Sequence, residues 1–248
     1  MSPFPQGEAA APAELGPSRR TVGMGALALA AAPDPRLRAE TQDVYFVRHG
    51  ESEVNVAIDP AQPDRGVSYP LTKLGVAQAR EMAARVTMAG PPGTLYASNL
   101  LRAVQTADAV AFSTGTPVRI SPALREVEFG EIDPGPTLAT SLAAVRAIYM
   151  AWLAGDRMVR GKGGESFDDV RGRVRAFLDQ ALATATRGAP IVIVSHRATL
   201  MVTGPEIFSN VTPAFAAAHP IPNCGVIHGR LVNGRLECRS WLGVEPKS

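Results

Sequence analysis

The sequence contains few of the residues that build disulfide frameworks, metal sites or nucleic-acid surfaces. Its 248 residues include two cysteines and four histidines, with no Cys-x-x-Cys and no His-Glu-x-x-His motif, so no zinc site is expected. Aromatic residues make up 6% of the chain, too few for an array that stacks on bases. The 25 basic and 23 acidic residues leave a net charge of +2. This weak excess predicts neither nucleic acid nor a membrane surface as a partner.

Long apolar runs are also lacking, and the longest candidate lies in a segment that does not resemble a folded domain. Val22–Ala32 is shorter than the roughly 20 residues that cross a bilayer. Before it, Met1–Pro17 is rich in Ala, Pro and Gly without a period, as in a disordered leader. The pair Arg19-Arg20 precedes the apolar run, and Ala30–Ala32 offers small residues for cleavage.

These parts predict that residues 1–41 are a leader, an export signal of the twin-arginine kind. The mature protein would then be periplasmic or exported. The alternative is an Ala-rich leader on a cytoplasmic enzyme. In either case residues 42–245 form the predicted catalytic domain.

The two cysteines are expected to be free thiols. Asn233-Gly234 predicts a two-residue type I′ turn that joins two apolar stretches into a hairpin. This pairing places Cys238 opposite Gly229 and leaves Cys224 well away along the strand.

From residue 43 onward, predicted strands alternate with predicted helices. The strands are expected at Asp43–Val47, Thr94–Ala97, Val118–Ile120, Ile191–Val194, Gly225–Val232 and Arg235–Trp241. The helices are expected at residues 72–89, 100–111, 141–154 and 166–186. Ile191–Val194 is wholly apolar, which is typical of a central strand. The alternation predicts an α/β fold, a three-layer α/β/α sandwich with a mostly parallel central sheet and an antiparallel C-terminal edge hairpin.

Reactive side chains follow three of the predicted strands. Arg48 and His49 follow the first strand, Arg102 begins the helix after the second, and His196 and Arg197 follow the central one. The carboxyl ends of parallel strands meet at one edge of a sheet, where ligands bind. Cations gathered there repel one another unless an anion lies between them, so a phosphate pocket is expected. We expect the His49 imidazole to be exposed at its strand end.

The same residues belong to blocks that resemble, in order, those of the histidine phosphatase superfamily, the phosphoglycerate-mutase-like enzymes. The resemblance extends from Asp43 to Trp241, about four-fifths of the chain. The blocks are Val47–Ser52 with Asn55; Leu71-Thr72 with Gly75, Gln78 and Ala79; Ser98 with Leu101–Ala103 and Gln105–Ala107; Leu124–Glu126 with Phe129-Gly130; Gly164–Ser166; and Val194–His196.

This resemblance implies a role for each site residue. His49 would attack phosphorus and carry the phosphoryl group as phosphohistidine. Arg48, Arg102 and His196 would hold the non-bridging oxygens. Glu126 would protonate the leaving oxygen and then help water to attack, with Glu128 as its rival.

The remaining positions are given binding or supporting roles. Asn55, Ser98 and Arg197 are assigned to substrate binding, and Glu51 and Glu165 are expected to support the site. No cofactor and no metal are implied.

Arg197 departs from the family pattern, in which glycine usually follows the second histidine. Its side chain could crowd the phosphate loop, add a cation for a more highly charged substrate, or point into solvent.

The spacing favours hydrolysis over phosphoryl transfer. Mutases of the family carry an arginine-rich insertion after the proton-donor segment. Here only Val127–Gly163 lies between the blocks, with Arg146, Arg157 and Arg160 as its arginines. The expected activity is phosphomonoester hydrolysis on a small phosphorylated molecule, with a phosphoprotein as the alternative substrate. The other two alternatives are a phosphoglycerate-type mutase and a non-catalytic phosphate-binding protein.

Overall fold

The computed structural model describes residues 41–56, 69–131 and 138–246 of the chain. All of these residues belong to one structural unit, Asp34–Ser248. The predicted leader falls on residues 1–40 outside the described part and therefore stays a prediction. Thr41 is the first residue of a strand.

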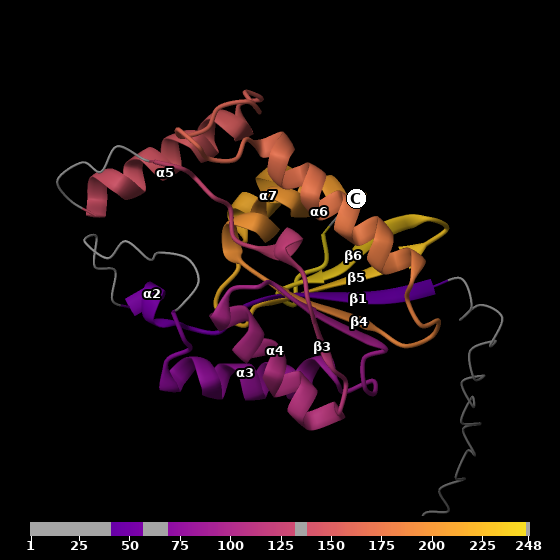
Figure 1. Cartoon of the computed structure of the whole chain (residues 1–248). Coiled ribbons are helices and arrows are strands. Elements are labelled where there is room, and N and C mark those ends of the chain that lie inside the picture. The colour runs from indigo at the N-terminus through magenta and orange to yellow at the C-terminus, as the bar shows by residue number, and fades with distance from the viewer. Residues whose placement is uncertain (1–40, 57–68, 132–137, 247–248) are drawn as a thin grey trace, which may run out of the picture. The chain divides into compact units, whose positions relative to one another are not determined.

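Six strands of the described chain form one mixed sheet in the order β3-β2-β4-β1-β5-β6 (Figure 1). The strands are β1 (Thr41–Arg48), β2 (Thr94–Ala97), β3 (Val118–Ile120), β4 (Ile191–Ser195), β5 (Val226–Val232) and β6 (Arg235–Trp241). The first four strands in chain order pair in parallel, and β5 and β6 add an antiparallel edge. The predicted fold class is confirmed.

Strand β4 is central because both of its faces are covered. Ile191 and Ile193 pack into the core on one side of the sheet, and Val192 and Val194 pack into the core on the other. All five residues of β4 are buried, which explains why its sequence is a continuous apolar run.

Helices cover both faces of the sheet (Figure 1). One core is formed with α3 (Lys73–Val86) and α4 (Leu101–Thr114), and the other with α6 (Phe167–Ala183) and α7 (Arg197–Ile207). Local signals set two of the helix starts: Thr72 caps α3, and Ser166 forms a capping box with Asp169 at α6. The remaining helical segments are α2 (Glu53–Val56), the 3₁₀ turn η1 (Pro122–Leu124), α5 (Leu138–Leu153) and α8 (Pro213–Ala218).

Helix α7 was not predicted, because its sequence contains two poor helix formers. Gly204 and Pro205 lie in its last turn. The structure explains the glycine: a Cβ at position 204 would come within 2.7 Å of the Trp241 ring. Packing against β6 therefore outweighs the low local propensity for helix.

The C-terminal hairpin has the predicted register. Val232 pairs with Arg235, and Gly229 pairs with Cys238. Asn233 and Gly234 have φ values of 51° and 76°, as a type I′ turn requires. Cys224 and Cys238 are free and buried, which confirms the prediction, and burial raises the pKa of each thiol to about 12. In the part of the chain that is described, no helix has the length and apolarity needed to span a membrane.

Candidate active site

The two predicted histidines and two predicted arginines come together at the carboxyl ends of β1, β2 and β4. Parallel pairing sets Arg48 opposite Ser195 in register, so the residues that follow each of them are neighbours. The rings of His49 and His196 are 5.0 Å apart between centroids. The Arg102 Nε lies 3.3 Å from the His49 Nε2. The structure therefore brings these four side chains together.

The two ring nitrogens of His49 have different partners. Nδ1 lies 2.7 Å from the Gly50 carbonyl oxygen, which can only accept, so Nδ1 carries the proton. Nε2 is thus the nitrogen with the lone pair, and it accepts from the Arg102 Nε–H. This arrangement fixes one tautomer and directs the nucleophilic nitrogen toward the arginine.

His49 is buried, with 3% of its surface exposed, so the expectation of an exposed imidazole is wrong. Two neighbouring segments hold its backbone in place. The Cys224 N–H lies within hydrogen-bonding distance of both the Arg48 and the His49 carbonyl oxygens, at 3.1 and 3.2 Å. On the other side the Gly50 N–H donates to the Thr106 hydroxyl at 3.0 Å.

Burial keeps both histidines neutral. It lowers the pKa of His49 from 6.5 to about 3, and the nearby Arg102 charge adds to this effect. Burial also lowers the pKa of His196 well below its ordinary value, with the His49 ring contributing next. A neutral imidazole is the form that can attack phosphorus.

Arg48 and His196 each present a buried nitrogen without a hydrogen-bond partner among the described residues, Nε of Arg48 and Nδ1 of His196. The opposite ends of both side chains are anchored. Arg48 donates from NH1 to the Ile221 carbonyl at 2.9 Å, and the His196 Nε2 lies 2.8 Å from the Ser98 hydroxyl. Buried polar atoms of native proteins normally have partners. These two nitrogens are therefore suited to bind the oxygens of an anion.

Repulsion inside the cluster affects the arginines as well. Burial lowers the pKa of Arg48 to about 10, with Arg197 as the next cause, while Glu126 raises it. Burial also lowers the pKa of Arg102, and Glu126 again opposes the shift. Glu126 is thus close enough to both arginines for its charge to be felt by each.

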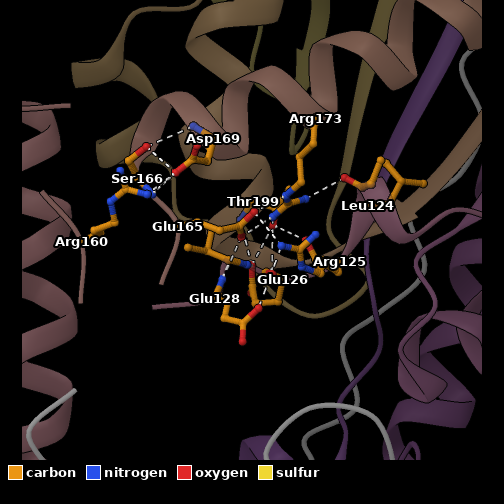
Figure 2. Close-up of polar contacts among 12 residues, drawn as sticks. Leu124, Arg125, Glu126, Glu128, Arg160, Glu165, Ser166, Asp169, Arg173 and Thr199 are labelled. Atoms are coloured by element: carbon orange, nitrogen blue, oxygen red, sulfur yellow. Dashed lines mark hydrogen bonds and ion pairs between the residues drawn. The ribbon is translucent and has the colours of Figure 1, made fainter. Parts of the chain in front are cut away.

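The Glu126 carboxylate is held at the start of α7. Its Oε1 accepts from the Val127 and Thr199 N–H groups at 3.0 and 2.9 Å, and its Oε2 accepts from the Ala198 N–H at 3.2 Å. Figure 2 shows this carboxylate beside Thr199. The N-cap residue His196 makes no side-chain cap, so Glu126 satisfies the first amides of the helix instead. Oε2 has the single, longer contact and is the less tightly held of the two oxygens.

The rival carboxylate, Glu128, lies further out. Its side chain is 65% exposed and approaches Arg125 at 4.0 Å. Glu128 contacts the supporting residue Glu165 through its backbone, whose N–H donates to the Glu165 Oε2 at 3.0 Å. The geometry therefore places Glu126, not Glu128, beside the histidine cluster.

Glu165 supports Glu126 through an arginine that the sequence analysis missed. Arg173 of α6 donates from Nε to the Glu165 Oε1 at 2.8 Å and from NH1 to the Ala123 carbonyl at 2.6 Å. Its NH2 reaches the Glu126 carbonyl at 3.5 Å. Figure 2 shows Arg173, Glu165 and Arg125 grouped around Glu126. The only sequence signal for Arg173 is its position two turns after the Gly-Glu-Ser block.

The other predicted binding residues lie around this centre in different environments. Asn55 is exposed, and its Oδ1 accepts from the Ser52 N–H at 3.1 Å and from the Asn223 Nδ2 at 3.2 Å. Asn223, a second residue that was missed, also donates to the His49 carbonyl at 3.1 Å. It connects the loop before β5 to the nucleophile, and no local pattern announces it. Ser98 is buried beneath His196, whereas Arg197 is exposed at the first position of α7.

Glu51 has a supporting role at the start of α3. Its carboxylate accepts from the hydroxyl of Thr72, the N-cap residue, at 2.7 Å. No group of three or more His, Cys, Asp or Glu side chains within the described ranges is arranged to hold a metal ion.

Comparison with known families agrees with this geometry. The model of the histidine phosphatase superfamily (branch 1) matches residues 44–242, a range that contains both histidines, both arginines and Glu126. The chain belongs to the histidine phosphatase superfamily. Within this superfamily it is a phosphatase-type enzyme with a six-stranded α/β fold.

Relatives of this histidine phosphatase have differing names. A Proteus mirabilis protein named probable phosphoglycerate mutase GpmB is 35% identical over 201 residues, which are 80% of this chain and 89% of the relative. The metal-independent phosphoserine phosphatase of Arabidopsis thaliana is 28% identical over 79% of this chain and 80% of its own. Among solved structures, mycobacterial glucosyl-3-phosphoglycerate phosphatase complexed with VO3 superposes with a TM-score of 0.65. It is 25% identical, over 81% of this chain and 98% of that one.

Proposed function

We propose that this histidine phosphatase hydrolyses small phosphomonoesters through a phosphohistidine on His49. One observation carries the proposal: the buried, neutral His49 ring has its Nδ1 fixed by the Gly50 carbonyl and its Nε2 beside Arg102. A phosphate bound by Arg48, Arg102 and His196 would have its phosphorus within reach of that nitrogen.

In the first step, the His49 Nε2 forms a bond to phosphorus while the bond to the leaving oxygen breaks. Glu126 gives its proton to that oxygen, so the alcohol leaves neutral. The ring becomes cationic, and its Nδ1–H bond to the Gly50 carbonyl becomes stronger because the donor is charged. Arg102 moves its hydrogen bond from the ring to the phosphate, because a dianion is the stronger acceptor.

In the second step, water attacks phosphorus and the nitrogen–phosphorus bond breaks. The Glu126 carboxylate takes a proton from the water, which restores the acid for the next cycle. His49 returns to its neutral form, and inorganic phosphate leaves. The arginines stabilise the charge on the phosphoryl oxygens in both steps.

Hydrolysis is favoured over mutase chemistry by the environment of the arginines between residues 127 and 163. Arg157 is paired with Asp168 and Glu206, and Arg160 is paired with Asp169. In these ion pairs the arginine charges are neutralised by carboxylates. A mutase would need such charges to bind the second phosphate of a diphosphate. The third arginine of this stretch, Arg146, is exposed on α5.

The experiment is an assay of the purified protein on a chromogenic phosphomonoester in the presence of a metal chelator. We expect turnover, undiminished by the chelator, because the arginines supply the positive charge at the phosphate. His49→Gln should reduce it to background. No turnover by the wild-type protein on any phosphomonoester tested would support the non-catalytic alternative, and restoration of a lost rate by magnesium or zinc would contradict the metal-free reaction.

We also propose that residues 1–41 direct export, on the strength of the Arg19-Arg20 pair and the apolar run that follows it. The test compares the full chain with an Arg19→Lys/Arg20→Lys variant in a bacterial host. Periplasmic activity that depends on the arginine pair is expected, and equal cytoplasmic retention of both proteins would contradict it.

A further inference from the structure

Arg197 lies beside the proposed phosphate site. It directly follows His196, whose ring is 5.0 Å from that of His49. It is the first residue of α7, and the next two amides of the same turn donate to the Glu126 carboxylate. Unlike Arg48 and Arg102, which are buried, Arg197 is exposed. Its position is thus at the cluster while its side chain is accessible from solvent.

The charge of Arg197 affects the pKa values of two residues on different elements. After burial, Arg197 is the largest cause of the lowered pKa of Arg48. Burial raises the pKa of Tyr149 on α5, and the charge of Arg197 opposes that rise. Both effects agree with the place of Arg197 in the chain, directly after His196 at the start of α7.

A further feature of Arg197 is that no carboxylate of the described segments neutralises its charge. No ion pair joins it to an acidic residue of the described segments, whereas Arg157 and Arg171 share Asp168 and Glu206 nearby. An unpaired cation beside buried cations raises the electrostatic energy of the free enzyme. The arrangement becomes favourable when an anion lies next to it.

We infer that Arg197 binds a second anionic group of the substrate, so that the enzyme prefers phosphomonoesters that carry a carboxylate or another phosphate a few bonds from the phosphoryl group. The inference rests on the proposed function, because the phosphoryl group must first be held at His49. The side chain could crowd the phosphate loop, add a cation beside the phosphate, or point into solvent. The first of these disagrees with its exposure. The start of α7 lies beside the site, since its next two amides donate to Glu126, and the charge of Arg197 acts on Arg48, which favours the second position, a cation beside the bound phosphate.

The test uses 3-phosphoglycerate and glycerol 3-phosphate, which differ by a carboxylate in place of a hydroxymethyl group. Each is measured as a competitive inhibitor of chromogenic ester hydrolysis, so that even a slow substrate gives an inhibition constant. The readout is the ratio of the two constants in wild type, Arg197→Gln and Arg197→Lys. Arg187→Gln is the matched control, since Arg187 is also exposed but lies before β4, at the opposite end of that strand.

We expect the wild-type protein to bind the carboxylate compound more tightly, and Arg197→Gln to reduce that preference about threefold to tenfold. Arg197→Lys should keep most of the preference, Arg187→Gln should keep all of it, and added salt should weaken it because the charge is exposed.

An unchanged ratio in Arg197→Gln, with the chromogenic ester still hydrolysed, would overturn the inference alone. If wild type hydrolysed no phosphomonoester at all, the proposed function would fall instead. The two failures are therefore distinguishable.

Discussion

At His49, burial and hydrogen bonding act on the same ring in opposite directions. Burial and Arg102 lower its pKa, whereas the Gly50 carbonyl, as acceptor for Nδ1–H, raises it. Burial dominates and leaves the pKa at about 3. The resting ring is therefore neutral. The hydrogen bond from Nδ1–H to the Gly50 carbonyl is strongest when phosphoryl transfer makes the ring cationic.

The pKa of His49 predicts a loss of stability in acid. In the unfolded chain His49 takes up a proton as pH falls through its ordinary value of 6.5, but in the folded chain only near 3. Above pH 6.5 His49 therefore does not lower the free energy of unfolding. As the pH falls from 6.5 toward 3, it lowers that free energy progressively. Between about pH 7 and about pH 5 the free energy of unfolding should fall by about 2 kcal/mol on account of this residue.

His49→Gln should show a smaller fall than the wild-type protein over the same range. Urea unfolding of both proteins at the two pH values measures the difference. His196 remains in both proteins, and the His49 ring contributes to its lowered pKa, so the measured difference includes the loss of that contribution. Identical pH dependence in the two proteins would mean that His49 is not held neutral by burial.

Glu126 is held by three backbone amides, and this geometry makes glutamine an informative replacement. Gln keeps the size of the side chain and can still accept at the position of Oε1, but it cannot titrate. We expect Glu126→Gln to reduce turnover about 10²- to 10⁴-fold for alkyl phosphates, whose leaving oxygen needs a proton. For a nitrophenyl ester, whose leaving group is stable as an anion, the loss should be much smaller.

Glu128→Gln is the matched control, since the same change is made two residues away on an exposed side chain. It should leave both rates near those of the wild-type protein. The opposite pattern, with a leaving-group-dependent loss in Glu128→Gln only, would show that Glu128 and not Glu126 transfers the proton.

At the scale of elements, local patterns predicted the sheet better than the helices that close the site. The apolar run of β4, the Thr72 cap and the Asn233-Gly234 turn are signals within a few residues, and the structure has each of them where predicted. Helix α7 has no comparable signal, because its stability comes from burial against Trp241.

The same distinction holds within the site. His49, Arg102 and His196 follow strand ends, so the α/β pattern was enough to bring them together. Arg173 and Asn223 act through contacts with residues 47 to 174 positions away. Such contacts depend on the final packing and leave no pattern in a single sequence.

The pairing of α6 with the proton-donor segment can be tested through Arg173. Arg173 and Glu165 have only 12% and 10% of their side chains exposed. We expect Arg173→Met to lower the free energy of unfolding by about 1–3 kcal/mol, because the buried Glu165 carboxylate loses one of its two arginine partners and keeps Arg125 at 2.9 Å. Denaturant unfolding at neutral pH measures this loss.

A double variant separates the pair from its surroundings. In Glu165→Gln/Arg173→Met the carboxylate charge that had kept only Arg125 is gone, so part of the lost stability should return. Arg175→Met on the same helix is the control, since its pair with Asp179 is exposed and should contribute little. Equal losses in Arg173→Met and Arg175→Met would contradict a buried supporting pair.

At the scale of the whole molecule, function depends on where charge lies rather than on its sum. A net charge of +2 gives little long-range attraction for an anion. The sheet instead gathers Arg48, Arg102 and two histidines at one edge, with Arg197 at the outer side. Binding of phosphate should therefore be local and short-ranged. The fold creates the site, because these residues come from segments that only the parallel strand order brings together.

The most direct test of this account is to trap the phosphoryl group on the protein. The wild-type protein is mixed with a phosphomonoester, quenched in base within the first turnovers, and digested for mass spectrometry. We predict a phosphoryl group on His49, stable in base and lost in acid, and none in His49→Gln. A phosphoryl group on a different residue, or full turnover by His49→Gln, would contradict the central claim that His49 is the nucleophile.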